Sequence, residues 1–235
     1  MIKEKLKRGT FLYKIYLYYH LFFRYKLFYK KKNYSQFNED LFIDNFFKNI
    51  QFGKFLDIGC FHPIRYNNTY LLYKKGWRGT NIDLNPTSID MFNIVRNQDT
   101  NICAAISETK KKMKIFFENS FSAANTLSEK IYNEDQKKNK LFKHVIEIQT
   151  KTLKELLKNK FDFLNIDVEG LDFDILKTID LELYRPNLIC IEILERDNKK
   201  KDKIFFYLKR FNYSFCKKGE VSYFFKLDSF NGYNI

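Results

Sequence analysis

The sequence lacks the features that would assign it to several common classes. Residues 11–29 are rich in aromatics, but their longest uncharged run is nine residues, 15–23, whereas a membrane-spanning helix needs ~20. No short apolar core precedes a small-residue cleavage site, so we expect no signal peptide. The four cysteines form no CxxC pair and no zinc-ligand spacing. We therefore expect free thiols in a reducing compartment, most simply the cytoplasm.

Two phosphate-binding signatures are also missing. The chain has neither GxGxxG, which brings a backbone close to a dinucleotide pyrophosphate, nor GxxxxGK[ST], which cradles nucleoside triphosphates. These absences disfavour a nicotinamide-dependent oxidoreductase and a P-loop enzyme. If the chain binds a nucleoside, we expect one without a phosphate chain.

Positive charge is concentrated at the N-terminus. The formal net charge is +14, yet residues 1–32 alone hold ten Lys or Arg and one acid, while the remaining chain holds 32 basic and 27 acidic residues. Nucleic-acid binding usually leaves a basic surface on the folded domain. The nearly equal numbers of basic and acidic residues in 33–235 therefore indicate no nucleic-acid partner. Salt-dependent binding to DNA would contradict this interpretation.

Residues 1–33 are expected to form a basic, aromatic helical segment ahead of a domain spanning residues 34–235. Within it, residues 11–29 combine Tyr and Phe with Lys and Arg, a composition suited to the headgroup region of a bilayer. However, Lys14, Arg24 and Lys26 do not share one helical face. Peripheral membrane contact and packing on the domain or on a second subunit both remain open.

Strand and helix patterns alternate along the rest of the chain, which predicts an α/β fold with a mostly parallel sheet and a C-terminal antiparallel hairpin. Residues 119–142 are polar with weak periodicity and are interpreted as a lid or insertion. Helices are expected at 41–47, 69–75, 87–97, 152–158, 172–178 and 201–211. Strands are expected at 53–60, 79–86, 100–107, 113–118, 145–148, 161–170, 188–194, 213–216 and 221–226.

Three of the predicted strands end in acids. Asp57 is followed by Gly59, Asp83 ends the next strand, and Asp167 with Glu169 ends a later one. In open α/β sheets, ligands bind beyond the carboxyl ends of the strands, so these acids are expected to meet in one pocket. In nucleotide-binding units, an acid about 20 residues after the glycine turn binds the ribose hydroxyls. Asp83 follows Gly59 at close to this interval. Asp83 could equally cap the following helix.

S-adenosylmethionine fits this arrangement. Its ribose suits Asp83, its cationic amino-acid end suits the acids near Asp57 and Asp167, and it carries no phosphates. Ala104 and Ala105, in a predicted strand, leave room for a flat group, although tight packing explains them equally well.

Six short pieces occur in order over roughly residues 34–195. They are Tyr34-Ser35-Gln36 with Glu39-Asp40, Leu56-Asp57-Ile58-Gly59, Asn68-Thr69, Gly76-Trp77-Arg78-Gly79, Ile82-Asp83 with Asn85-Pro86, and Ile166-Asp167-Val168-Glu169-Gly170. In these pieces and their order the chain resembles the FkbM-type S-adenosylmethionine-dependent methyltransferases. The resemblance implies a class I methyltransferase (Rossmann-like, doubly wound) fold and O-methylation of a sugar or glycan-like acceptor. The turn after Gly59 departs from many relatives of the fold, since His62-Pro63 stands where a second glycine is common.

These arguments assign roles to named residues. Glu169 is either a general base or a cap of the helix near Asp172, and His62 is either a base or a hydrogen-bonded loop anchor. No distinctive metal spacing is present, so no metal is assigned. The alternative to an enzyme is a non-catalytic binding protein that keeps the fold. The predicted catalytic residues are Asp167, Glu169 and His62, and the predicted cofactor-binding residues are Asp57, Gly59, Cys60, Asp83, Leu84, Ser107 and Asp167.

Overall fold

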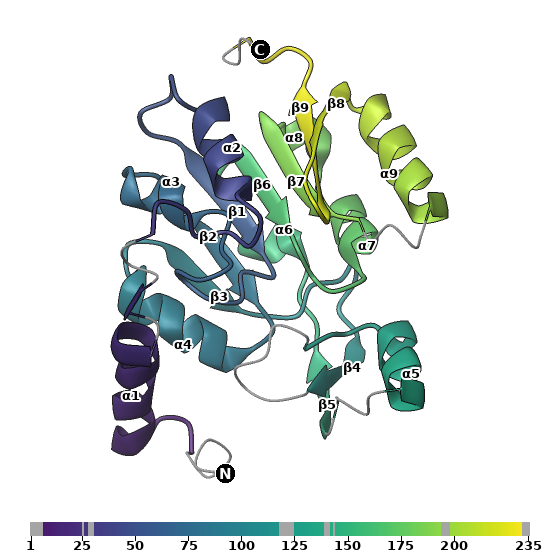
Figure 1. Ribbon diagram of the computed structural model, residues 1–235. Coiled ribbons are helices and arrows are strands. Elements are labelled where there is room, and N and C mark those ends of the chain that lie inside the picture. The colour runs from purple at the N-terminus through teal and green to yellow at the C-terminus, as the bar shows by residue number, and fades with distance from the viewer. Residues whose placement is uncertain are drawn as a thin grey trace.

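A seven-stranded sheet forms the centre of the molecule in the computed structural model (Figure 1). Its strand order is β3-β2-β1-β6-β7-β9-β8. The strands from β3 to β7 pair in parallel, and β9 and β8 join at one edge as an antiparallel hairpin. The predicted fold class is confirmed. The structure describes residues 7–24, 26–27, 31–117, 125–138, 142, 144–193 and 198–231.

The strands of this sheet coincide with the apolar runs in the sequence. Branched and aromatic side chains favour a pleated, buried surface, and a parallel sheet covered on both faces needs nearly continuous apolar strands. The strands are β1 (Lys54–Ile58), β2 (Arg78–Asp83), β3 (Thr100–Cys103), β6 (Phe163–Ile166), β7 (Leu188–Glu192), β8 (Tyr213–Lys218) and β9 (Ser222–Leu227).

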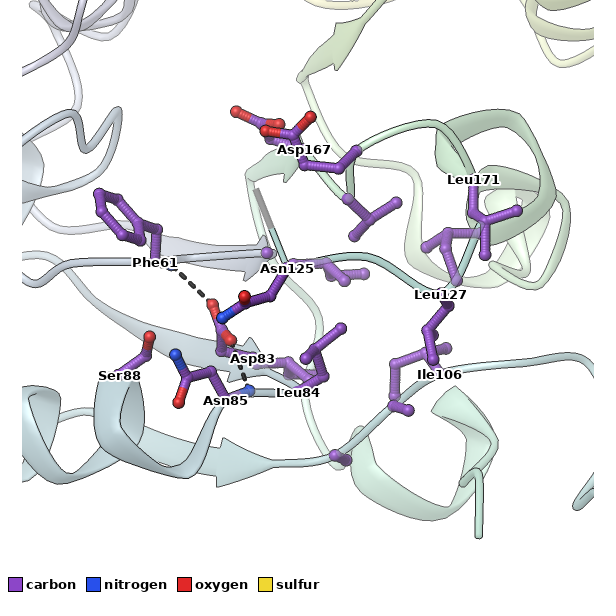
Figure 2. Close-up of a pocket in the computed structure, with 18 residues that line it drawn as sticks. Phe61, Asp83, Leu84, Asn85, Ser88, Ile106, Asn125, Leu127, Asp167 and Leu171 are labelled. Carbon is purple, nitrogen blue, oxygen red and sulfur yellow. Dashed lines mark hydrogen bonds between the residues drawn. The ribbon is translucent and has the colours of Figure 1, made fainter. Parts of the chain in front are cut away.

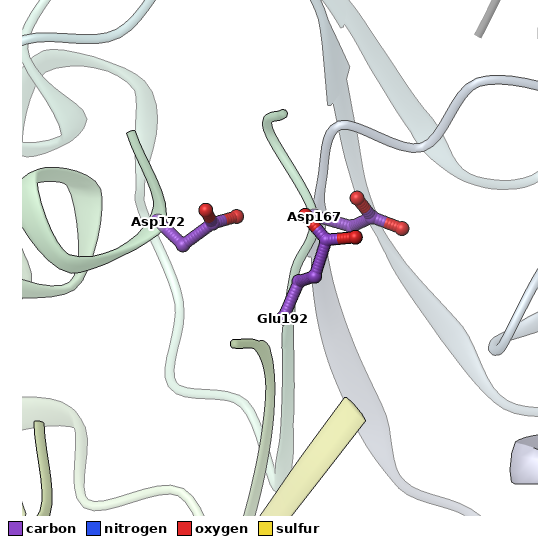
Figure 3. A group of neighbouring side chains, drawn as sticks. All are labelled: Asp167, Asp172 and Glu192. Atoms are coloured by element: carbon purple, nitrogen blue, oxygen red, sulfur yellow. The ribbon is translucent and has the colours of Figure 1, made fainter. Parts of the chain in front are cut away.

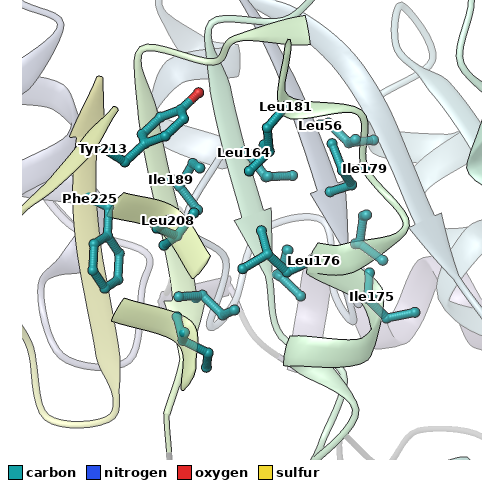
Figure 4. Packing of buried hydrophobic residues seen from close by; sticks show 14 of the residues in the cluster. Leu56, Leu164, Ile175, Leu176, Ile179, Leu181, Ile189, Leu208, Tyr213 and Phe225 are labelled. Atoms are coloured by element: carbon teal, nitrogen blue, oxygen red, sulfur yellow. The ribbon is translucent and has the colours of Figure 1, made fainter. Parts of the chain in front are cut away.

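Helices cover both faces of the sheet because successive side chains of each strand point to opposite sides. Phe55 of β1 lies beside Phe163 of β6, and both pack in a cluster with α2. The next residues, Leu56 and Leu164, are also paired and pack with Ile189 of β7 against α7, α8 and α9 (Figure 4). The two buried faces make this a doubly wound fold.

Several helices begin at residues whose side chains cap them. The Asn85 Oδ1 atom accepts the Thr87 amide at 3.0 Å, and Pro86 fills the first helical position. The helices are α1 (Phe11–Tyr18), the π-helical η2 (Tyr19–Arg24), α2 (Glu39–Phe46), α3 (Tyr70–Lys74), α4 (Pro86–Val95), α5 (Glu129–Lys138), α6 (Leu153–Leu156), α7 (Asp172–Lys177), α8 (Leu181–Tyr184) and α9 (Asn198–Arg210).

The region between β3 and α6 departs from the expected arrangement. The strand predicted at 100–107 ends at Cys103, because the Ala105 carbonyl accepts the Lys151 amide at 2.9 Å and the chain leaves the sheet. The strands predicted near 113–118 and 145–148 are present as β4 (Lys112–Phe117) and β5 (His144–Gln149), but they form a separate antiparallel pair. Of the predicted lid, residues 125–138 and 142 are described; residues 119–124 and 139–141 lie outside the described residues.

The N-terminal helix packs on the domain along one face. Tyr13, Leu17 and Leu21 are buried in a cluster with Met91 of α4. This packing agrees with one of the two alternatives drawn from the sequence. Across the described residues, no helix combines the length and apolarity needed to cross a membrane.

Candidate active site

A cavity opens at the carboxyl ends of β1, β2 and β6 (Figure 2). Five of the residues assigned from the sequence line it, and they include two of the three strand-end acids expected to meet there, Asp83 and Asp167. These five residues are Gly59, Asp83, Leu84, Asp167 and Glu169.

Asp83 is held rigidly at the end of β2. Its Oδ2 atom accepts the Phe61 amide at 2.8 Å, and its Oδ1 atom accepts the Asn85 amide at 2.7 Å. Burial raises the pKa of its carboxyl group to about 6, which leaves it mostly ionised at neutral pH. Each carboxylate oxygen keeps a second lone pair. A fixed carboxylate with spare acceptor capacity suits a pair of neighbouring hydroxyls.

Gly59 occupies a position that no other residue fits. Its φ is +82°, and a Cβ atom there would lie 1.7 Å from the Asp167 carbonyl oxygen. Its amide donates to the Ile82 carbonyl at 2.8 Å, while the Asp167 amide donates to the Ile58 carbonyl at 2.9 Å. The glycine therefore lets the ends of β1, β2 and β6 come into direct contact at the cavity.

Asp167 and Glu169 both reach the cavity because the strand gives way to a turn. β6 ends at Ile166, and Glu169 and Gly170 have φ of +54° and +104°. Burial, then the nearby Asp167 and Asp172 carboxylates, raise the pKa of Glu169 to about 7. A carboxyl group that titrates near neutral pH can accept a proton from a substrate.

Glu169 is not the residue that holds the start of α7. The Asp172 carboxylate accepts the Val168 amide at 2.9 Å and the Gly170 amide at 3.2 Å. The N-cap residue, Leu171, makes no side-chain cap. This geometry favours the interpretation of Glu169 as a cavity residue over the capping alternative.

A cluster of carboxylates lies beside Glu169. Oxygens of Asp167, Asp172 and Glu192 lie within 4.8 Å of one another (Figure 3). Although the Asp167 residue keeps access to solvent, loss of water around its carboxyl group, then the charges of Glu192 and Asp172, raise its pKa well above its ordinary value. The Lys200 Nζ atom lies 3.1 Å from Asp172 Oδ2 and offsets part of the negative charge. Carboxylate oxygens are the donors that Mg²⁺ prefers, and they also attract an organic cation.

Comparison with known proteins decides the family. A model of the methyltransferase FkbM domain matches residues 57–215, more than half of this 235-residue chain. The chain belongs to the FkbM methyltransferase family. The matched part runs from β1 to β8 and contains all the residues assigned to the site.

One solved structure supports the fold of this FkbM-family chain. The crystal structure of methyltransferase FkbM from Methylobacillus flagellatus KT is similar, with a TM-score of 0.50 and 11% sequence identity. The similarity covers 74% of this chain but 44% of that chain, so this protein matches less than half of the other's length. A comparison with curated proteins found no match.

Asp57 does not line the cavity. It is buried in β1, where its carboxylate accepts the Asn165 amide nitrogen at 2.8 Å and the Thr69 hydroxyl at 2.8 Å. Successive strand residues alternate in direction, so Ile58 faces the cavity and Asp57 faces the opposite side of the sheet. A carboxylate inside a strand needs hydrogen-bond partners, and Asp57 finds them in the buried side chains of Asn165 and Thr69.

Three other assigned residues also lie outside the cavity lining. Cys60 is buried with Ile89 and Phe92, and the Ser107 hydroxyl is engaged with Thr150 at 2.8 Å. The buried His62 ring accepts the amides of residues 64 and 65 at its Nδ1 atom, at 3.2 and 3.1 Å. Burial, then Arg65 and His20, lower its pKa well below the ordinary value. This placement agrees with the loop-anchor interpretation of His62.

The cavity also contains residues that the sequence did not single out as site residues. Asn125 and Leu127 come from the insertion, and in Figure 2 the Asn125 side chain points toward Asp83. The Thr126 hydroxyl donates to the Glu169 carbonyl at 2.9 Å, which ties the insertion to the turn after β6. Ala104 and Ala105 line the cavity, in line with the space inferred from their small size.

The raised pKa of Glu169 predicts a pH-dependent stability. A carboxyl whose folded pKa exceeds its ordinary 4.5 stabilises the fold below that value, and the stabilisation is lost as pH rises through about 7. The parent protein should therefore lose stability as the pH rises from about 5 to 8, whereas Glu169→Gln should not. The free energy of unfolding of the variant, relative to that of the parent, should rise by about 2 kcal/mol over this range. Urea unfolding at both pH values measures the difference.

The control for this measurement is Glu182→Gln, because Glu182 is an exposed carboxylate on α8. It should change stability little at either pH. A stability difference for Glu169→Gln that does not vary with pH would contradict the environment described for this side chain.

Proposed function

We propose that this FkbM-family chain transfers a methyl group from S-adenosylmethionine to a hydroxyl of a sugar or glycan-like acceptor. The observation that carries the proposal is the fixed Asp83 carboxylate, in one cavity with Asp167 and Glu169 and next to a turn that has a single glycine. The family generally uses S-adenosylmethionine. The residues suit that cofactor, since they offer acceptors for a ribose and negative charge for a cation.

Each residue has a separate part in the proposed reaction. Asp83 would hold the two ribose hydroxyls with its spare lone pairs, and Asp167 would attract the cationic end of the cofactor. When bound, S-adenosylmethionine supplies a methyl group on a positively charged sulfur. Glu169 would accept the hydroxyl proton as the acceptor oxygen bonds to the methyl carbon and the carbon–sulfur bond breaks, its electrons remaining on sulfur.

Asn125 and Leu127 would help to exclude water from this reaction. Both belong to the insertion and line the cavity. Displacement at a sulfonium requires the nucleophile to be aligned and competing water to be kept away.

Ligand binding tests the proposal. Isothermal titration calorimetry should detect S-adenosylmethionine and S-adenosylhomocysteine but not NAD, because the turn after β1 lacks the glycines that a pyrophosphate needs. Binding of NAD with no binding of either adenosyl compound would contradict the cofactor assignment. A second assay measures transfer of a radiolabelled methyl group to a panel of glycans. We expect a labelled product that is stable to alkali, as an O-methyl ether is. A product cleaved by alkali would indicate an ester instead.

A further inference from the structure

The outward face of the N-terminal helix is strongly apolar. Five side chains of α1 and η2 are at least half exposed and lie together around a shallow surface groove that is almost free of polar atoms. Their exposed fractions are 77% for Phe11, 50% for Ile15, 52% for Tyr18, 52% for Tyr19 and 68% for Phe23. A continuous exposed apolar patch of this kind indicates an interaction surface.

The orientation of this face is fixed by the opposite side of the helix. Tyr13 and Leu17 are buried against α4, and the Tyr13 hydroxyl donates to Asp90 at 2.8 Å. Arg8 forms two hydrogen bonds with the same Asp90 carboxylate, at 2.7 and 2.8 Å. Because one face of the helix packs on the domain, the aromatic face on its other side points away from the domain.

This arrangement explains the poor amphipathic pattern of the segment. A helix that packs on its own domain needs one apolar stripe, whereas this helix is apolar on two opposite sides. The first side is covered by α4 (Figure 1). The second side has no cover among the residues that the structure describes.

Positive charge surrounds the exposed face. Residues 7–27 contain five Lys or Arg and no acid, and of these Arg8 is paired with Asp90 of α4. Lys14 lines the apolar groove itself, and Lys7 and Lys26 are exposed nearby. Aromatic side chains beside lysines match the interface of a bilayer, where rings enter the headgroup region and ammonium groups meet anionic lipids.

We propose that this face docks the protein on a membrane surface that contains anionic lipids. A second copy of the chain would bring two acid-free basic segments together, and like charges disfavour that contact. An anionic bilayer offers the opposite charge as well as the apolar depth for Phe11 and Phe23. The helix would lie in the plane of the interface, since it is too short to span it.

The helix that docks also contacts the helix that borders the cavity. The Tyr13 hydroxyl lies 3.3 Å from the Thr87 hydroxyl at the start of α4, and the next residue, Ser88, lines the cavity. The helix that docks is therefore anchored one residue from the proposed cofactor site.

Vesicle sedimentation with the full chain tests the proposal. We expect the protein to bind phosphatidylcholine vesicles that contain roughly 30% phosphatidylserine and to bind pure phosphatidylcholine much more weakly. The triple variant Phe11→Gln, Ile15→Gln, Phe23→Gln should bind at least about tenfold more weakly. Lys7→Ala with Lys14→Ala should lose about fivefold for each lysine.

Matched controls carry the same changes elsewhere. Phe52, Leu183 and Phe206 are also exposed, at 71%, 52% and 70%, and their replacement by Gln should leave vesicle binding unchanged. Lys137→Ala with Lys138→Ala, on α5, is the charge control. Circular dichroism checks folding, and the lysine variants decide the question if the triple variant does not fold.

Several outcomes would overturn the proposal. One is that the protein binds neutral and anionic vesicles equally well. Another is that the triple variant folds and still binds anionic vesicles as tightly as the wild-type protein. If the protein instead forms a dimer by light scattering, binds no vesicles, and becomes monomeric in the triple variant, the face belongs to a second copy. Because no step of the assay uses S-adenosylmethionine, its result is independent of the proposed function.

Discussion

Replacing Asp83 with alanine should weaken S-adenosylhomocysteine binding by at least about 100-fold. Hydrogen bonds to a charged group contribute about 1.5–3 kcal/mol each, and two ribose hydroxyls would lose theirs, at 1.4 kcal/mol per tenfold. The effect should be large because the Asp83 carboxylate is buried and already oriented by the Phe61 and Asn85 amides. Titration calorimetry of the folded variant gives the ratio of dissociation constants.

Two further variants separate binding from folding. Asp83→Asn keeps the shape and one acceptor oxygen, so its loss should be intermediate, about tenfold. Asp174→Ala removes an exposed carboxylate on α7 and should leave the affinity unchanged. Undiminished affinity in a folded Asp83→Ala protein would remove this residue from the cofactor site and leave only the helix-capping role for its position.

The second large effect concerns stability. Arg96 is fully buried, with its Nε atom 2.9 Å from the Asp99 carboxylate and its Nη1 atom 2.9 Å from the Thr69 hydroxyl. The Thr69 hydroxyl in turn donates to Asp57 at 2.8 Å. Removing the one arginine would leave two buried carboxylates without a positive partner.

We therefore expect Arg96→Ala to lower the free energy of unfolding by about 3–5 kcal/mol. The guanidinium also stacks on Phe55, Tyr73 and Phe92, at 4.9–5.1 Å from the ring centroids, so packing adds to the loss. Urea denaturation with an unchanged slope would report this difference as stability alone.

The surface pair Asp174–Lys177 is the control. Its atoms lie 2.9 Å apart, like those of Arg96–Asp99, but its side chains are 64% and 47% exposed. Lys177→Ala should cost about 1 kcal/mol or less, because water screens exposed charges. If Arg96→Ala costs no more than Lys177→Ala, the buried network does not support the fold as described.

Much of the fold followed from local pattern. The apolar strands at β1, β6 and β7 are visible in the sequence because both faces of a parallel sheet are covered, which demands nearly unbroken apolar runs. Asp83 and Gly59 were also predictable, since each stands where a strand ends. The separate antiparallel pair of β4 and β5 was not predictable, because the pattern of a strand does not show which other strand it pairs with.

The part of the site that the insertion contributes depends on contacts between segments far apart in the sequence. Asn125 and Leu127 belong to a polar stretch whose weak periodicity gave no indication of α5 or of the place of these two residues in the cavity. Asp57 carries the same strand-end signature as Asp83, yet the alternation of the strand turns it away from the cavity.

By itself, the sequence determined the alternation of strands and helices, the parallel sheet and the acids at the strand ends, because these follow from short-range periodicity and turn chemistry. Only the tertiary structure decided which acids share a cavity and which belong to the buried network around Arg96. It also decided that the N-terminal helix packs on α4 with one face and exposes the other. The reason is that each of these depends on contacts between segments far apart in the chain, which local pattern does not encode.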